Sequence, residues 1–187
     1  MAGPVITIVL PVSLREHAQE MLDAYLRRLA DHNFFEHPRP GHWALNLEPE
    51  RLGIAESDRE GSRPFLVNVE GPGYGDGDCF EDGRYIESDW GFLPPLLGFT
   101  PANMIDAIAM CNGRVDHIVT ALMTADIMDI VHGVAFLELW DGQVEPVRAL
   151  PGVLAAMPKT ADGPAFALGD GRFLRAFAAT PGFRLRK

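Results

Sequence analysis

The sequence predicts an α+β fold, a single domain in which helices pack on one face of a mainly antiparallel sheet. β-Branched and aromatic runs of strand length recur along the chain, and amphipathic runs of helix length stand among them. The two kinds do not alternate as strictly as a doubly wound parallel sheet requires. The 187 residues contain no internal repeat or linker, so residues 1–187 are expected to form one domain that buries a sizeable core without disulfides or metals.

The N-terminal third predicts a strand, a helix and further strands. Residues 5–10 are a β-branched run with apolar side chains on both faces, as expected of a buried strand. Ser13 and Glu16 have the spacing of a capping box, which predicts the start of a helix. Apolar residues then recur at helical spacing, so a helix is expected over residues 14–30. Further strands are expected at 34–35, 42–47 and 64–70, with a polar, irregular segment at 48–63.

Residues 71–78 are expected to form a glycine-rich loop, and the rest of the chain is expected to contain both helices and strands. Thr100 and Pro101 have the chemistry of an N-cap followed by proline at the first helical position, so a short helix is expected from there to Met110. A wide apolar face predicts a second helix over residues 115–131. The remaining expectations are a short strand at 85–86, a strand at 134–140, a hairpin of 152–157 with 164–168, and an amphipathic helix at 172–178.

Charge is distributed unevenly along the chain. The net charge is −10, and residues 70–145 carry 14 acids against two bases, whereas residues 146–187 carry seven bases against two acids. A negative field repels nucleic acid and anionic membranes, which disfavours both as partners. Such a field attracts a basic protein and speeds its association. The alternative is that the acidity only keeps the chain soluble.

The segment from residue 74 to residue 90 is the predicted partner-binding site. Aromatic side chains there interleave with carboxylates, and the combination can anchor a partner rich in arginine or lysine. The predicted aromatic anchors are Tyr74, Tyr85 and Trp90. The predicted carboxylates are Asp76, Asp78, Glu81, Asp82, Glu87 and Asp89.

The same segment has a partial likeness to a calcium loop. Counting from Asp76, ligands fit at the first, third and twelfth positions, but Phe80 stands at the fifth and Glu81 replaces the glycine of the turn. Histidines at five-residue steps, which are His32, His37 and His42, could hold a metal only if a hairpin brought them together. We therefore predict no metal site and no cofactor.

No familiar catalytic motif is present, and we predict that the chain is not an enzyme. The alternating glycines of residues 71–77 do not match a dinucleotide-binding G-x-G-x-x-G. A thiol site of Cys111 with His117 is the one enzymatic alternative, and it requires contact across a junction between elements. The two cysteines are too few for a disulfide framework, which favours a reducing compartment and predicts a cytoplasmic location.

Three blocks of the chain resemble the DUF6368 family of uncharacterised bacterial proteins. The first is the opening at residues 3–11, and the second is Met-Cys-Asn-Gly-Arg-Val-Asp-His at 110–117 with the following helix and residues 132–136. The third is the end of the chain, at 173–177 and 181–187. No activity comes with this resemblance. It implies an association with toxin and immunity loci, where small α+β proteins of this kind occur.

These observations predict an immunity-type protein that binds and neutralises a cognate bacterial toxin domain through an acidic surface. Such an inhibitor needs a few dominant anchors and no catalytic residue. The alternatives are a structural or self-associating module, whose acidity only keeps it in solution, and the thiol-dependent enzyme. The oligomeric state stays open.

Overall fold

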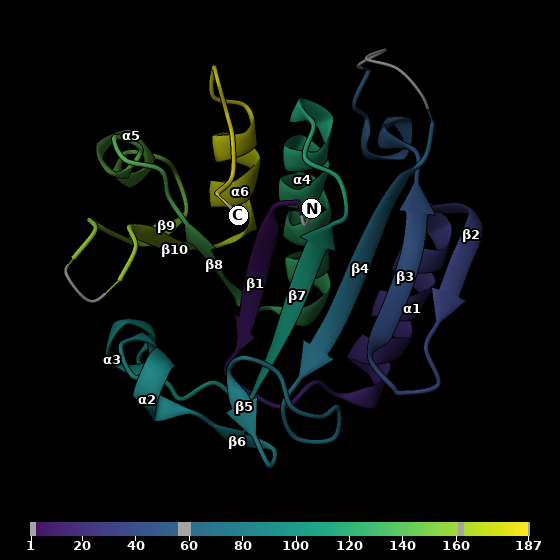
Figure 1. Ribbon diagram of the computed structural model, residues 1–187, viewed down its shortest axis with the longest axis horizontal. Helices are drawn as coiled ribbons and strands as arrows, with labels where there is room; N and C mark the ends of the chain where they lie inside the picture. Colours follow the sequence, from purple (N-terminus) through teal and green to yellow (C-terminus); the bar gives the residue numbers. More distant parts are fainter. Residues whose placement is uncertain (1–2, 56–60, 161–162, 187) are drawn as a thin grey trace.

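A single large antiparallel sheet organises the protein (Figure 1). The computed structural model describes residues 3–55, 61–160 and 163–186, without the side chains of residues 88 and 89. Over these residues the sheet has eight strands in the order β2-β3-β4-β7-β1-β8-β10-β9, and each neighbouring pair is antiparallel. The strands are β1 (Val5–Leu10), β2 (Ala30–Glu36), β3 (His42–Leu47), β4 (Arg63–Glu70), β7 (Asn103–Ala109), β8 (Val134–Glu138), β9 (Val153–Met157) and β10 (Phe166–Gly169).

The longer helices lie together on one face of this sheet, behind the strands in the view of Figure 1. They are α1 (Glu16–Leu29), α4 (Arg114–Val131) and α6 (Gly171–Ala178). Their apolar side chains and those of the strands beneath them form the main core, in which Leu22, Leu26 and Phe173 are fully buried. The predicted α+β class with an antiparallel sheet is confirmed. No helix in the described part of the chain has the length and apolar character needed to cross a bilayer.

The predicted helix at residues 100–110 is wrong, because this segment is the central strand β7. It pairs with β1 on one side and with β4 on the other. Its residues alternate between faces: Ile105 and Ala107 enter the helix-side core, whereas Met104 enters an apolar cluster on the opposite face. Hydrogen bonds on both edges and burial on both faces outweigh the helical propensity of alanine and methionine.

The predicted capping box at the start of α1 is also wrong. The helix begins at Glu16 with Arg15 at its N-cap, and no side chain caps it. The preceding amide of Leu14 instead donates a hydrogen bond to Oδ1 of Asn103, at 3.0 Å. A buried residue from β7 therefore replaces the local cap that the sequence predicts.

The C-terminal hairpin and helix form as predicted. β9 and β10 pair antiparallel, and α6 follows directly. Asp170 caps α6, because its side chain accepts hydrogen bonds from the amides of Arg172 and Phe173. Two short helical elements complete the helix side, η1 (Pro49–Leu52) and α5 (Val144–Arg148).

The opposite face of the sheet is partly covered by the chain between β4 and β7. This segment contains β5 (Phe80–Glu81), β6 (Arg84–Tyr85), α2 (Glu87–Trp90) and α3 (Leu93–Leu97), which Figure 1 shows gathered beyond one end of the central strands. Phe80 and Leu93 are buried there against Val9 and Met104 of the sheet. A second, smaller core thus fixes the predicted partner-binding segment to the sheet.

Candidate binding surface

The predicted carboxylates lie on the segment between β4 and β7. The side chains of Asp76, Asp78, Glu81, Asp82 and Glu87 are all exposed. Asp82 adopts a left-handed backbone with φ of 49°, and Oδ1 of Asp76 accepts a hydrogen bond from the amide of Gly83 at 3.1 Å. The side chain of Asp89 lies outside the described residues. The side chain of Asp76 therefore helps to hold the turn that carries Asp82.

Among the described residues, these carboxylates differ from several others in the acidic middle of the chain, because those others form ion pairs. Arg175 on α6 pairs with Asp126 and Asp129 of α4, at 2.8 Å and 2.5 Å. Arg186 pairs with Glu138 at 3.2 Å. Among the described residues, none of the five exposed acids at 76–87 forms an ion pair. The basic C-terminal segment thus neutralises part of the negative charge on residues 126–138, and within the described chain it provides no counterion for the acids of residues 76–87.

The three predicted aromatic anchors are not equivalent. Tyr74 packs against the main core, and its hydroxyl donates to Oε1 of Gln19 on α1 at 2.9 Å. The hydroxyl of Tyr85 donates to the carbonyl of Trp90, and burial raises the pKa of this phenol above its ordinary range. Both tyrosines therefore hold the segment in place. Trp90 is half-buried and lines a pocket.

That pocket is a part of the surface that sequence reasoning missed. It has a volume of about 590 Å³ and lies between the α2–α3 segment and strands β8, β9 and β10. Aromatic rings form much of its lining, among them Trp90, Phe92, Phe136 and Phe166. Because these rings come from three separate stretches of chain, no local pattern in the sequence indicates them.

Sequence reasoning also missed a pair of neighbouring carboxyl groups beneath the glycine-rich loop. Glu70 ends β4, and Asp106 is half-buried in β7, where it accepts a hydrogen bond from the hydroxyl of Thr7 at 2.5 Å. Burial, and then the negative charges of Asp106 and Asp78, raise the pKa of Glu70 to about 7. The negative charge of Asp106 beside Glu70 therefore favours a proton on Glu70 over a second carboxylate at this place. If residues 103–109 had been interpreted as a strand, their alternation would have placed Asp106 on the face of the sheet opposite the helices.

The remaining candidates are dispersed or engaged elsewhere. His117 is buried in α4, and its Nδ1 accepts a hydrogen bond from the amide of Leu185 at 3.1 Å, so this nitrogen is not available as a base toward Cys111. The rings of His37 and His42 lie edge to face, with centroids 6.1 Å apart. Over the residues that the structure describes, no group of three or more His, Cys, Asp or Glu side chains is placed to hold a metal ion.

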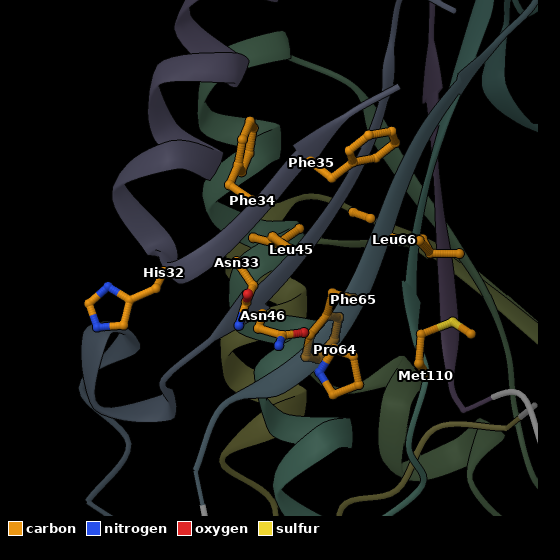
Figure 2. A pocket seen from close by; sticks show the side chains of 11 residues that line it. His32, Asn33, Phe34, Phe35, Leu45, Asn46, Pro64, Phe65, Leu66 and Met110 are labelled. Carbon is orange, nitrogen blue, oxygen red and sulfur yellow. The ribbon is translucent and has the colours of Figure 1, made fainter. Parts of the chain in front are cut away.

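A second exposed region lies on the sheet over β2, β3 and β4. Figure 2 shows Phe35, Leu66 and Met110 on one side of these strands, with Phe34 and Leu45 on the other, toward the helices. The side chain of Phe35 is 57% exposed and that of Met110 is 43% exposed. They border a shallow pocket of about 320 Å³. This half of the sheet therefore presents apolar side chains on its outer face.

Comparisons with known proteins assign the chain to a family without assigning an activity. No curated protein and no solved structure matches it. A family model described as a family of unknown function, DUF6368, matches residues 2–187 and so includes all three blocks of the resemblance. The chain belongs to the DUF6368 family.

Proposed function

We propose that this protein is an immunity-type protein that binds a cognate bacterial toxin domain in the cytoplasm and neutralises it. The observation that carries the proposal is the set of exposed acids at residues 76–87 that lack ion pairs within the described chain. The protein acts by binding and performs no reaction of its own. Its partner is a basic protein surface, and nucleic acid and membranes are not its targets.

Electrostatics favours this mode of action. Unpaired carboxylates raise the rate at which a basic partner associates, and like charges suppress acidic competitors. A stable inhibitory complex buries about 1,600 Å² of surface in total. The acidic loop and the adjacent aromatic pocket together offer both the charges and the apolar contact area that such an interface needs.

Co-expression with the product of the neighbouring gene tests the proposal. The C-terminal domain of that product should arrest growth when expressed alone, and this chain should restore growth when it is co-expressed. Purified together, the two proteins should form a complex. Absence of both rescue and complex formation would contradict the proposed function.

Neutralising the five acids should slow association by about tenfold at low salt and flatten its salt dependence, because steering depends on these charges. Association rates at low and high ionic strength measure the effect. Asparagine suits positions 76 and 82, because it keeps the acceptor for Gly83 and tolerates a positive φ. The variant carries Asp76→Asn, Asp78→Asn, Glu81→Gln, Asp82→Asn and Glu87→Gln.

A matched control neutralises five exposed acids elsewhere and should change the association rate much less. These acids lie on α1, η1, the turn after β8 and α5. If both variants slow association equally, net charge rather than this segment drives binding. The control carries Glu16→Gln, Glu20→Gln, Glu50→Gln, Asp141→Asn and Glu145→Gln.

Self-association is the second candidate function, and the apolar outer face of β2–β4 favours it. Phe35 projects from the edge strand of the sheet, where a second chain could pack or pair. Sedimentation velocity should then reveal a concentration-dependent dimer that Phe35→Ser abolishes. A monomer at all accessible concentrations would rule this candidate out.

A further inference from the structure

The aromatic pocket is an apolar concave surface whose lining includes Trp90, the last residue of the acidic segment. Its outer edge is exposed: Phe92 is 40% exposed, Leu96 39% and Met157 37%. Its inner wall is buried, with Phe136 only 8% exposed. A pocket of about 590 Å³ lies within the range in which proteins hold ligands and interface anchors.

The aromatic rings that line the pocket, from Phe92 at its outer edge to Phe136 at its base, contact one another and are therefore preformed. The ring centroids of Phe92 and Phe166 lie 5.1 Å apart, and those of Phe136 and Phe166 lie 5.5 Å apart. Trp90 meets Phe136 edge to face at 5.3 Å. These spacings are those of attractive aromatic pairs, so an occupant meets a wall that needs little rearrangement before binding.

The described lining of the pocket is almost free of charge. Glu138 is the one acidic side chain in the described lining, and Arg186 already pairs with it. Glu87 begins the helix that Trp90 ends, and the hydroxyl of Tyr85 binds the carbonyl of Trp90. The acidic segment therefore joins the pocket at α2, where Glu87 stands three residues before Trp90.

We propose that this pocket seats an aromatic side chain of the protein partner, presented between lysine or arginine residues. The aromatic ring stacks on the preformed wall, and the flanking cations meet the acids of residues 76–87. Burying one aromatic side chain removes about 150–250 Å² from water, which makes it a dominant anchor. This inference rests on the proposed function, because it assigns the chemistry of the partner that the same surface recognises.

Short peptides test this proposal without any toxin. The probes are three acetylated and amidated peptides that place phenylalanine between two lysines, alanine between two lysines, and phenylalanine between two glutamates. Binding is followed by the indole N–H signal of Trp90 in ¹⁵N-correlated NMR spectra of the full chain. The first peptide should shift this signal saturably, and the other two should bind about tenfold more weakly, which corresponds to about 1.4 kcal/mol.

Substitutions at the exposed outer edge of the pocket, its rim, show where the peptide binds. Leu96→Ser and, separately, Phe92→Ser should weaken the first peptide about tenfold, and an unchanged unfolding transition verifies that each variant is folded. Phe35→Ser removes an exposed phenylalanine from β2, at the opposite edge of the sheet from the pocket, and should leave binding unchanged.

Three outcomes would overturn the proposal. Equal binding of the glutamate-flanked peptide would indicate a pocket for apolar groups without charge selection. Binding that survives both rim variants would place the site elsewhere. A Trp90 signal that shifts with protein concentration alone would make a second copy of the chain the occupant. Growth rescue by this chain together with failed peptide binding would remove this inference and leave the proposed function, and the reverse result would remove only the toxin-neutralising role.

Discussion

Asn103→Ala should lower the free energy of unfolding by about 2–4 kcal/mol, because three backbone groups lose at once the hydrogen bonds that this one buried side chain makes. Asn103 is fully buried at the start of β7. Its Nδ2 donates to the carbonyls of Glu70 and Pro72, at 2.9 Å and 3.3 Å, and its Oδ1 accepts from the amide of Leu14. One side chain thus ties the entry of α1 and the base of the glycine-rich loop to the sheet.

Urea-induced unfolding measures this effect, and hydrogen exchange locates it. Amides of residues 71–79 should exchange faster in the variant than in the parent chain, because the base of their loop is released. Asn33→Ala, at an exposed position on β2, serves as the control and should change stability by less than about 0.5 kcal/mol. A loss below about 1 kcal/mol for Asn103→Ala would show that water replaces these bonds at little cost.

Glu70→Gln should stabilise the protein at pH 8 by about 1–2 kcal/mol and have little effect near pH 4.5. Burial and the neighbouring charges of Asp106 and Asp78 raise the pKa of Glu70 from 4.5 to about 7. The folded state therefore holds this proton more tightly than the unfolded chain does. The stabilisation that comes from this proton is fully present below the pKa of Glu70 in the unfolded chain. It is lost as the pH rises through the pKa of Glu70 in the folded state. Because Glu70 is partly exposed, solvent screening reduces the effect below the full value of the shift.

Unfolding curves of both chains between pH 4.5 and pH 8 test this dependence. The parent chain should lose stability relative to Glu70→Gln mainly between about pH 4.5 and 7, as Glu70 loses its proton and its negative charge stands beside those of Asp106 and Asp78. The matched control is Glu81→Gln, which neutralises an exposed acid on β5 and should give a difference near zero at both extremes. A constant difference across the whole range would mean that the carboxyl pair does not titrate in this window.

This titration also bears on the binding surface. A Cβ at Gly77 would lie 1.9 Å from Cδ of Glu70, so the loop that carries Asp76 and Asp78 rests directly on the Glu70 carboxyl group. Losing the proton from this pair should therefore loosen the loop as well as lower the global stability. Exchange rates of the amides at 75–79, measured across the same pH range, report this local effect.

The sequence by itself determined the fold class and most elements, because their signals are local. The β-branched run of β1, the amphipathic spacing of α1, α4 and α6, and the hairpin of β9 with β10 each lie within one short stretch, where periodicity reports burial directly. The uneven charge along the chain was equally visible. The distribution of charge along the sequence does not show, however, that Arg175 and Arg186 pair with acids of residues 126–138.

Only the tertiary structure decided β7, the entry to α1, the carboxyl pair and the aromatic pocket. β7 is a strand because β1 and β4, both more than 30 residues away, pair with its two edges. Leu14 meets Asn103 across 89 positions of the chain, and the walls of the pocket come from residues 90–96, 136–138, 157–160 and 163–166. Local patterns in the sequence indicate which residues are buried. The partners that meet in the core are selected by chain topology, which acts between segments far apart in the sequence.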